Sequence, residues 1–481
     1  MTLHEKILID GEWTNGSGSD RFDVINPATC EVFATVPKAT REDVSNAVDA
    51  AEAAFSSWAG LTPFKRGEYL RKASEIAFSR AEEIARIMTQ EQGKPFPEAL
   101  GEVKKGAEIL RYYAEEGERI YGRIIANAEG YLESRVIYQP MGVAAAISPW
   151  NYPIELLAWK LGGALASGCT SVCKLPSETP VSPLAFIKCI LDAGVPKGVV
   201  NELTGAGSVV GPVLLRNPKV KKVAFTGSTA VGKQVLSDCA GTLKKVSLEL
   251  GGSLPMIVCR DCDIEAAVAG AVRRSFRNMG QICIAINRIY VDREIYEPFL
   301  NKFAAAAKKL TIGNGLVKNC DLGPMCNKAG IDTVADHIAD GVKKGARLLC
   351  GGKKPEGPEF EKGYFYEPSI LADVNHTMKV MTEETFGPLA GVMPFETVDK
   401  AIRLANDTVY GLAAIVYTQS LVLAQRLALE LNAGNVAINN VDAGVINAPY
   451  GGWKDSGFGH EHGPEGLYEY LYTKHVRVCY K

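Results

Sequence analysis

Three segments of the sequence carry side chains that together could oxidise an aldehyde. The segment Phe276–Cys283 ends on a thiol, Glu249 opens a Glu-Leu-Gly-Gly stretch, and Pro149–Pro153 contains the amide of Asn151. A thiol nucleophile and a carboxylate base are the two groups needed to turn an aldehyde into an acid through a thioester. A side-chain amide can donate a hydrogen bond to the alkoxide that forms when the thiol attacks. The three segments therefore predict covalent aldehyde oxidation.

These segments closely resemble the aldehyde dehydrogenase superfamily, and the resemblance runs over almost the full chain, from Ile25–Pro27 to Pro449–Gly452 and beyond. It implies an NAD(P)-dependent, non-phosphorylating enzyme of the α/β class. The implied fold has a Rossmann-like parallel-sheet cofactor domain, an α/β catalytic domain and a small β oligomerisation arm. The resemblance makes Cys283 the nucleophile, Glu249 the base that activates water, and the Asn151 side chain with the Cys283 backbone N–H the oxyanion donors.

Taken singly, each of these residues has a plainer interpretation. The chain has twelve cysteines, and most cysteines of such a protein are inert core residues. A nucleophilic cysteine needs an electropositive, partly exposed setting, which the resemblance supplies through a cationic nicotinamide near Cys283. Glu249 alone could be a salt-bridged residue at the end of an apolar strand. The presence of both together with Asn151 favours catalysis. Ser253 stands where the family commonly has lysine, which affects a local contact rather than the chemistry.

The bulk composition excludes several classes of protein. The chain has 481 residues, 47% of them hydrophobic and 22% charged, with a net charge of -2. This length predicts two or three domains, and this charge leaves no basic face for nucleic acid. There is no apolar run of about 18 residues and no signal-peptide pattern at Met1–Lys6, so neither a membrane span nor secretion is predicted. A cytoplasmic protein with reduced cysteines is expected.

The hydrophobic pattern changes along the chain from helical to alternating. Apolar residues recur at helical spacing from Thr40 to Trp58, with Thr40 as N-cap, and helices are expected to dominate the first 120 residues. Short apolar runs then alternate with helical stretches, which predicts a doubly wound parallel sheet that binds a nucleotide at its carboxyl edge. These runs lie at 142–148, 170–174, 199–204, 221–226 and 245–250.

A second α/β series is expected from Asp263 to about Thr418, with strands at Arg288–Asp292, Ala346–Cys350 and Gly411–Tyr417. The stretches 121–140 and 473–480 alternate as strands outside both series, and in the resembled family such strands form the oligomer arm. The resemblance sets the domain borders. It assigns 1–120 and 141–250 to the NAD(P)-binding domain, 251–435 to the catalytic domain, and 121–140 with 436–481 to the arm and closing segment. A homotetramer or homodimer is expected.

Two glycine-rich stretches lie in the expected cofactor domain, and neither has the standard dinucleotide fingerprint. In Gly205–Gly211 the last glycine comes one position late, and in Gly227–Gly232 a threonine replaces the second glycine. A P-loop is excluded because Gln234 occupies the position of the magnesium-binding hydroxyl. What remains is a turn with Gly227 and Ser228 at a helix N-terminus, which could bind a pyrophosphate or be only a cap and a turn.

The resemblance implies further cofactor contacts. Lys174 lies where the family handles the adenosine ribose, and Ser177 stands where strict NAD enzymes usually carry a glutamate. A lysine and a serine can bind a 2′-phosphate without like-charge repulsion, so NADP is admitted beside NAD, although Glu178 follows directly. Glu384 and Phe386 resemble the pair that holds the nicotinamide ribose and ring. The other implied contacts are Ser148, Trp150, Asn151, Gly207, Gly227, Ser228 and Leu250.

Within the superfamily the succinate-semialdehyde dehydrogenase branch is the most similar, through Ser275–Asn278, Asn287-Arg288 and Lys174 with Ser177. Arg277 is expected at the pocket mouth, where it would meet the distal carboxylate of a substrate. Trp159 stands at the place of that branch's second arginine, so a single anchoring cation is expected. The implied pocket residues are Tyr152, Trp159, Arg277, Ile282 and Ile284. Lactaldehyde, glycolaldehyde and sulfolactaldehyde therefore compete with succinate semialdehyde as substrates.

Two other classes of protein and two metal motifs are disfavoured. A CoA-acylating aldehyde dehydrogenase usually lacks a base at the Glu249 position, and a non-enzymatic relative would be expected to lose Cys283 or Asn151. The pairs Cys259 with Cys262 and His460 with His462 lack second ligand pairs at suitable spacing. No metal is expected.

Overall fold

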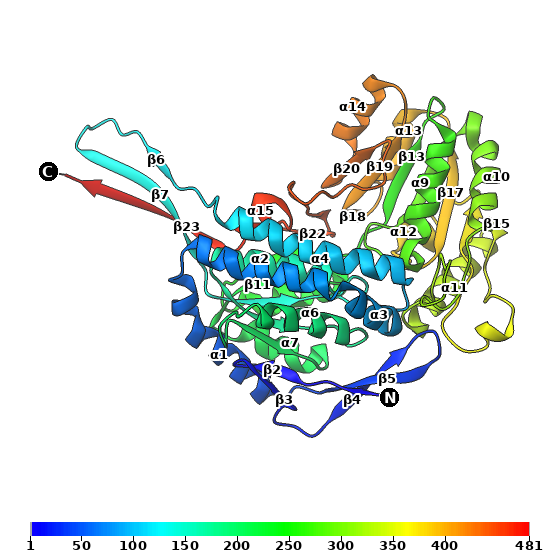
Figure 1. Cartoon of the computed structure of the whole chain (residues 1–481). Helices are drawn as coiled ribbons and strands as arrows, with labels where there is room; N and C mark the ends of the chain where they lie inside the picture. Colours follow the sequence, from blue (N-terminus) through cyan, green and yellow to red (C-terminus); the bar gives the residue numbers. More distant parts are fainter. Residues whose placement is uncertain (1, 481) are drawn as a thin grey trace.

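The structure is a computed structural model that describes residues 2–480. Two sheets form its two lobes, and a thin three-stranded arm projects from one of them (Figure 1). The first sheet has eight strands in the order β22-β12-β11-β8-β9-β10-β2-β3. Its five central strands run parallel, as the alternating pattern predicts, and antiparallel strands close both edges. The strands are β22 (Gly457–Phe458), β12 (Lys245–Glu249), β11 (Val220–Thr226), β8 (Val143–Ile147), β9 (Thr170–Lys174), β10 (Val200–Leu203), β2 (Ile7–Ile9) and β3 (Glu12–Thr14).

Helices cover both faces of the first sheet, because the central strands are buried on both sides. One face packs against α1 (Arg41–Ala59), α7 (Gly207–Arg216) and α8 (Thr229–Ala240). The other carries α5 (Glu155–Ser167) and α6 (Val181–Asp192), with an outer layer of α2 (Pro63–Ser79), α3 (Ala81–Gln92) and α4 (Phe96–Gly117). The predicted N-cap of α1 is confirmed: Thr40 accepts from the Asp43 backbone N–H, and the Asp43 side chain accepts from the Thr40 N–H.

The second sheet has seven strands in the order β15-β16-β17-β14-β13-β19-β20, and its central strands form one apolar core with the helices around them. All neighbours run parallel except β15, which pairs antiparallel with β16. The strands are β15 (Arg347–Cys350), β16 (Ser369–Ala372), β17 (Leu389–Phe395), β14 (Ile286–Asp292), β13 (Leu254–Val258), β19 (Ala413–Tyr417) and β20 (Asn435–Ile438). Its helices are α9 (Ile264–Phe276), α10 (Tyr296–Ala307), α11 (Lys328–Lys343), α12 (Lys379–Thr382), α13 (Val398–Asn406) and α14 (Leu421–Glu430). The strands β18 (Tyr410–Gly411) and β21 (Trp453–Lys454) form a short antiparallel pair. The helix α15 (Gly463–Tyr468) packs against α4 and α5 of the first lobe.

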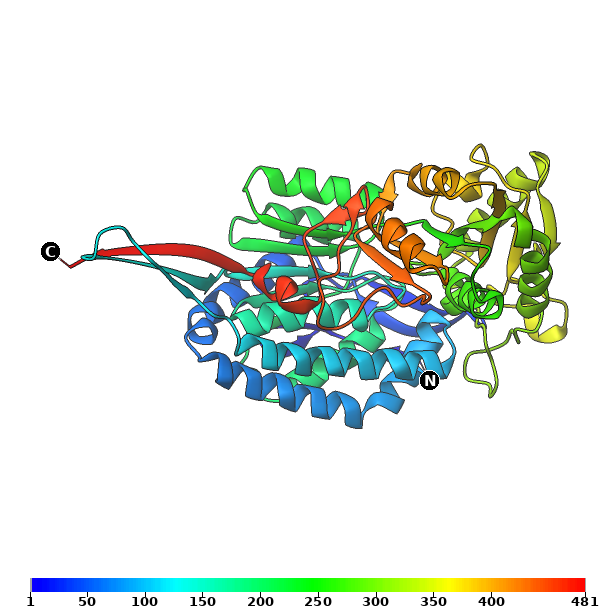
Figure 2. The ribbon, with the colours of Figure 1, turned by 90° about the horizontal axis from the view of Figure 1, so that it is seen from above.

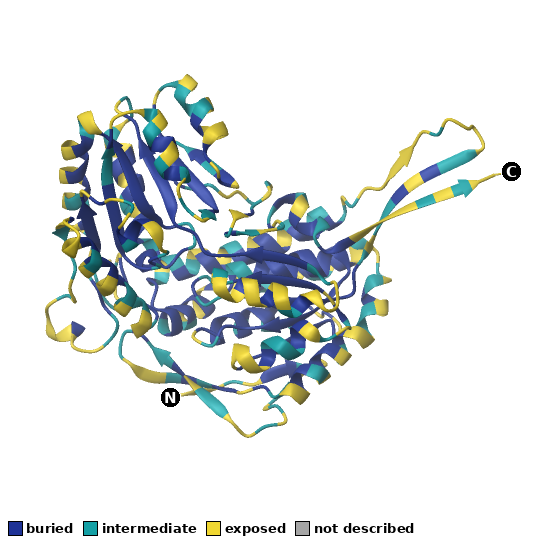
Figure 3. Cartoon of the chain, turned by 180° about the vertical axis from the view of Figure 1, so that it is seen from behind, coloured by how far each residue is buried: buried dark blue, intermediate teal, exposed yellow. Residues whose placement is uncertain are grey.

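The arm consists of β6 (Arg123–Ile125), β7 (Leu132–Pro140) and β23 (Leu471–Cys479). β7 pairs antiparallel with both neighbours, so the strands predicted at 121–140 and 473–480 are confirmed and form one sheet. Seen from above, the arm extends away from both lobes (Figure 2). Coloured by burial, the arm strands are mostly exposed or half-buried, whereas the central strands of both large sheets are buried (Figure 3).

The structure differs from the expected pattern at the N-terminus and near the domain borders. Residues 2–40 contain strands and no helix, with β1 (Leu3–His4), β4 (Arg21–Asn26) and β5 (Glu31–Pro37) in a small sheet of their own, so helices begin only at Arg41. These strands are short and mostly half-exposed, so their apolar and polar residues alternate only weakly and the sequence did not predict them. β20 crosses the border expected at residue 435, and β22 of the expected closing segment joins the first sheet. Within residues 2–480 no helix is both long and apolar enough to span a lipid bilayer.

Candidate active site

Cys283 lies where two cavities meet, between the two lobes. The first, called here the β11-turn cavity, has a volume of about 250 Å³; the second, the aromatic cavity, has about 200 Å³. Cys283 and Asn151 line both. The other residues of the β11-turn cavity are Pro149, Trp150, Leu156, Thr226, Gly227, Ser228, Leu250, Gly251, Glu384 and Phe386. A thiol at this junction can react with a molecule in one cavity while a second molecule occupies the other.

The backbone before Cys283 is unusual. Asn278, Met279 and Gly280 are consecutive residues in the left-handed region, with φ of 48°, 57° and 66°. This conformation is costly for residues other than glycine and persists only where surrounding contacts hold it. At Gly280 a Cβ atom would lie 2.2 Å from the Gly387 carbonyl oxygen, so glycine is required. Asn278 is held by hydrogen bonds: its Oδ1 accepts from Gln92 Nε2 at 3.0 Å, and its backbone carbonyl accepts from Gln281 Nε2 at 3.0 Å.

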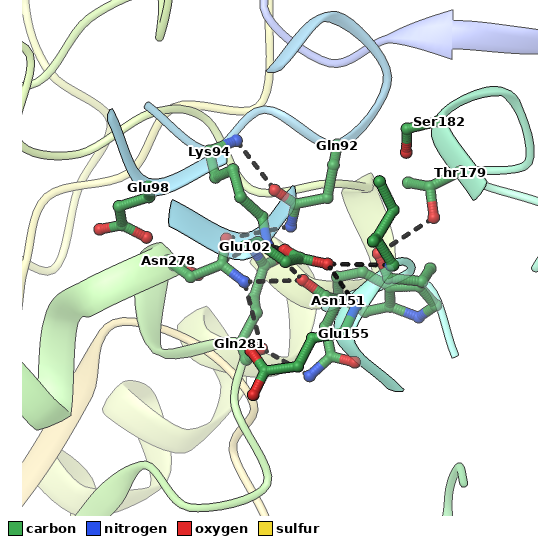
Figure 4. A network of polar contacts seen from close by, with 12 residues as sticks. Gln92, Lys94, Glu98, Glu102, Asn151, Glu155, Thr179, Ser182, Asn278 and Gln281 are labelled. Atoms are coloured by element: carbon green, nitrogen blue, oxygen red, sulfur yellow. Dashed lines mark hydrogen bonds and ion pairs between the residues drawn. The ribbon is translucent and has the colours of Figure 1, made fainter. Parts of the chain in front are cut away.

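A buried polar network fixes Asn151 against this segment (Figure 4). Asn151 Nδ2 donates to the Gln281 carbonyl at 2.9 Å, which directs the amide toward the nucleophile. The Asn151 carbonyl accepts from Lys94 Nζ at 2.8 Å and from Asn278 Nδ2 at 3.2 Å. Lys94 in turn pairs with Glu102 of α4, and both side chains are fully buried. Sequence reasoning missed Lys94 and Glu102, which no motif of the nucleophile marks.

Glu249 ends β12 and is buried. Neither of its carboxylate oxygens has a hydrogen-bond partner among residues 2–480. Burial, together with the nearby Glu461 carboxylate, raises the pKa of Glu249 well above its usual value, whereas the Lys160 ammonium lowers it. Lys160 Nζ lies 2.6 Å from Glu461 Oε1 and donates to Thr226 Oγ1 at 2.6 Å. A carboxylate with a raised pKa and free lone pairs is suited to accept a proton from water.

The predicted electropositive setting of Cys283 is not provided by the side chains around it. Cys283 is partly exposed, as expected. Burial raises the pKa of its thiol to about 12, and the Glu249 and Glu384 carboxylates contribute to this rise. Only the Arg274 guanidinium acts in the opposite direction among the side-chain charges that influence this thiol. The prediction assumed the positive charge of a bound nicotinamide ring, and the side chains around Cys283 do not supply an equivalent positive charge.

The aromatic cavity brings together all five residues expected to bind substrate: Tyr152, Trp159, Arg277, Ile282 and Ile284. Trp159 stacks on His462 with ring centroids 3.6 Å apart, and His462 stacks on Tyr450 at 4.9 Å. Burial lowers the pKa of His462 to about 3, so this ring is neutral. The remaining lining residues, which the motifs did not predict, are Glu155, Leu156, Arg274, Asp442, Ala443, Gly444, Tyr450 and His462.

A second cation lines this cavity beside the one expected to anchor the substrate. Arg274 and Arg277 both line it, and they come from the end of α9 and the turn after it. Arg277 also forms an ion pair with Glu98 of α4, with Nε 3.6 Å from Oε2. It therefore lines the pocket and forms a salt bridge at the same time. Burial raises the pKa of the nearby Glu155 to about 7, so its negative charge is incomplete at neutral pH.

A third, larger cavity of about 660 Å³ lies along the carboxyl edge of the first sheet. It holds the expected contacts Ser148, Lys174, Ser177 and Gly207, and it shares Trp150, Gly227 and Ser228 with the β11-turn cavity. Ser228 caps the N-terminus of α8, accepting from the Val231 N–H at 3.4 Å. A Cβ atom at Gly207 or Gly211 would meet only open space, so the α7 side leaves room for a ligand. These features fit a dinucleotide with its pyrophosphate near α8.

The remaining expected cofactor contacts, Leu250, Glu384 and Phe386, line the β11-turn cavity. Glu384 Oε1 accepts from the Gly252 N–H at 3.0 Å, and burial raises the pKa of this carboxyl to about 7. Phe386 packs edge-on against Trp150 with ring centroids 5.4 Å apart. Glu178, the neighbour of Ser177, lines the large cavity as well, so both residues face the same space.

Comparisons of the sequence and the structure with known proteins all point to the same protein family. The profile described as the aldehyde dehydrogenase family matches residues 13–476. The chain is 43% identical to succinate-semialdehyde dehydrogenase [NADP(+)] of Escherichia coli over 99% of its length and 98% of that protein. It is 41% identical to 3-sulfolactaldehyde dehydrogenase of Pseudomonas putida over 98% of its length and 97% of that protein. A crystal structure of an E. coli NADP-dependent enzyme matches with a TM-score of 0.97 and 42% identity, covering 99% of this chain and 98% of that one.

Proposed function

The chain belongs to the aldehyde dehydrogenase family, and we propose that it oxidises a short aldehyde with an anionic far end to the carboxylic acid. It is an NAD(P)-dependent enzyme of this family. The observation that carries the substrate proposal is the aromatic cavity, which has the Cys283 thiol at one end and two guanidinium groups in its wall. Its volume of about 200 Å³ suits a short chain.

In the proposed reaction the aldehyde enters the aromatic cavity, and the thiolate of Cys283 attacks its carbonyl carbon. The second N–H of the Asn151 amide and the backbone N–H of Cys283 stabilise the alkoxide. NAD(P)⁺ supplies the hydride acceptor, and Trp150, Glu384 and Phe386 would hold its nicotinamide end. Loss of hydride leaves a thioester on Cys283. Glu249 then takes a proton from a water molecule, which attacks the thioester and frees the acid.

The anionic group at the far end of the substrate is either a carboxylate or a sulfonate. A guanidinium binds either group through charge-assisted hydrogen bonds. Relatives with both kinds of substrate support this range, since one acts on succinate semialdehyde and another on 3-sulfolactaldehyde. Lactaldehyde and glycolaldehyde are the neutral alternatives, and the two guanidinium groups argue against them because a neutral substrate offers no anion for charge-assisted hydrogen bonds.

For the cofactor we infer that NADP is used. Lys174 and Ser177 line the large cavity together, and they can bind a 2′-phosphate. Glu178 faces the same cavity and would repel that phosphate if it pointed at the ribose. The E. coli relative named for NADP supports the inference.

A homotetramer or homodimer is proposed from the arm. Its strands expose large apolar side chains that a second copy could cover: Ile124 is 80% exposed and Tyr472 is 50% exposed. The metal-free, cytoplasmic character expected from the sequence remains a prediction.

The experiment that tests the proposed function is a panel of aldehydes assayed with NAD and with NADP. Succinate semialdehyde and butanal form the key pair, because they have the same number of carbons and differ by the carboxylate. We expect a higher kcat/KM for succinate semialdehyde or for sulfolactaldehyde than for butanal, lactaldehyde and glycolaldehyde. Equal or better use of the neutral aldehydes would contradict the anionic substrate. A requirement for CoA, with an acyl-CoA product, would contradict hydrolysis.

A further inference from the structure

Arg274 is a buried cation whose bonding capacity is largely unused. It lies in the last turn of α9 and is 5% exposed. One terminal nitrogen bonds to Asp442 Oδ1. Its Nε has no hydrogen-bond partner within the described part of the chain, although the atom is buried. A buried guanidinium N–H without a hydrogen-bond partner costs free energy. Binding of a group that supplies the missing acceptor is therefore favourable.

The charges around Arg274 leave an excess of positive charge. Asp442 is shared, because Arg273 NH2 lies 2.9 Å from Asp442 Oδ2 while Arg274 holds Oδ1. One carboxylate therefore serves two guanidinium groups. Arg277, three residues later, is paired with Glu98. Glu155 also lines this wall and carries an incomplete negative charge, because burial raises its pKa to about 7. The positive charges around Arg274 therefore favour the binding of one more anion.

The position of Arg274 also fits a bound substrate. It lines the same cavity as Cys283 and Trp159, and its charge is felt by the thiol of Cys283 and by the hydroxyls of Tyr152 and Tyr450. Residues three apart at a helix end project to the same side, so Arg274 and Arg277 face the cavity together. Trp159 is part of the same wall, with its ring stacked on His462.

We propose that Arg274 binds the anionic far end of the substrate, with its unpaired Nε–H and a terminal N–H directed at two oxygens of the carboxylate or sulfonate. Arg274 then provides the second anchoring cation that Trp159 cannot provide. Asp442 holds the guanidinium in place in the absence of substrate. This proposal rests on the proposed function, since it presupposes an anionic substrate.

The test compares Arg274→Met with Arg273→Met on succinate semialdehyde and butanal. Arg273 contacts the same Asp442 but is half-exposed and does not line the cavity, so its replacement is a matched control. We expect Arg274→Met to raise KM for succinate semialdehyde roughly 10–100-fold, the loss of a charge-assisted hydrogen bond, and to change butanal oxidation less than about threefold. Arg273→Met should leave both substrates close to the unchanged enzyme.

An equal loss on both substrates would overturn the proposal, because Arg274 would then act on folding or on the Cys283 thiol. The same selective loss in Arg273→Met would overturn it too. Asp442→Asn gives an independent readout if Arg274→Met does not fold. Removing the competing carboxylate should lower the ratio of KM for succinate semialdehyde to KM for butanal, and an unchanged or raised ratio would count against the proposal. If the unchanged enzyme does not prefer succinate semialdehyde or sulfolactaldehyde over butanal, the proposed function itself fails.

Discussion

Lys160 of α5 and Glu461, which precedes α15, form an ion pair whose two charges act on the candidate base Glu249. Nζ and Oε1 are 2.6 Å apart, the Lys160 side chain is fully buried, and the two residues are 301 positions apart in sequence. The two charges act on Glu249 in opposite directions: Glu461 raises its pKa and Lys160 lowers it. Burial is the largest cause of the raised pKa of Glu249, and the two members of the ion pair adjust that pKa further.

Replacing either member of this pair should shift the pH dependence of turnover. Glu249 must be ionised to activate water, so turnover falls on the acid side as Glu249 takes up a proton. Lys160→Met removes the charge that lowers the pKa of Glu249, and the acid limb of kcat should move to higher pH. Glu461→Gln should move it to lower pH. Steady-state kcat from pH 5 to 10 measures both, with the exposed Lys104→Met as control. Shifts of the same sign in the two variants would exclude this electrostatic role.

Cys283→Ala is expected to abolish dehydrogenase turnover, because the thiol forms the covalent bond to the substrate. Binding of the dinucleotide, followed by fluorescence titration, should remain within a few-fold of the unchanged enzyme, since alanine keeps the walls of the β11-turn cavity. Cys320→Ala is a suitable control because Cys320 is also partly exposed but does not line the two cavities at Cys283. Substantial aldehyde oxidation by Cys283→Ala would refute the assignment of the nucleophile.

Glu249→Gln should separate the two halves of the reaction. Acylation precedes the water step, so a rapid-mixing experiment should still show a burst of reduced cofactor close to one equivalent per site. Steady turnover should then fall by about 10²–10⁴-fold, the loss typical of a general base. If the burst is lost as well, Glu249 is needed before the thioester forms, and the proposed division of roles is incorrect.

Ser177→Glu should shift cofactor use from NADP toward NAD. The new carboxylate would repel the 2′-phosphate in the large cavity while accepting hydrogen bonds from the ribose hydroxyls. The ratio of kcat/KM for NADP to that for NAD measures the change. Glu178→Gln is the control, because both residues line this cavity. If Glu178→Gln instead reduces the use of NAD, Glu178 binds the ribose, and absence of NADP activity in the unchanged enzyme would contradict the Ser177 inference.

Lys94→Met should lower both stability and kcat. It leaves Glu102 buried without its cation, which typically costs about 3–5 kcal/mol, and it removes a donor from the Asn151 carbonyl. We expect a lower thermal midpoint and a kcat reduced roughly 10-fold or more, with little change in KM for the dinucleotide. Lys105→Met is the matched control, since Lys105 forms only an exposed pair with Glu108 at 3.5 Å. Equal kcat values in the two variants would show that the pair supports folding alone.

Local sequence patterns predicted the helices and strands whose apolar residues recur at regular spacing. They also predicted the catalytic residues that lie within short motifs. The α1 helix with its Thr40 cap and the five central strands of the first sheet follow from short-range spacing and from alternation of apolar runs with helices. β13 was not predicted, because it follows β12 after only a short loop and no helical stretch separates the two strands. The segments around Cys283, Glu249 and Asn151 were recognisable because their functional groups sit within short motifs.

The sequence alone therefore determined the family, the fold class and the candidate nucleophile, base and oxyanion donor. Only the tertiary structure decided what surrounds them. Lys160 meets Glu461, and Arg274 meets Asp442 across 168 positions, through packing of distant segments. The contribution of the protein side chains to the charge around Cys283 likewise depends on Glu249 and Glu384 as neighbours in space. The physical reason is that motifs record which groups are present along the chain, whereas pKa values and pocket charge depend on burial and on distances that only folding sets.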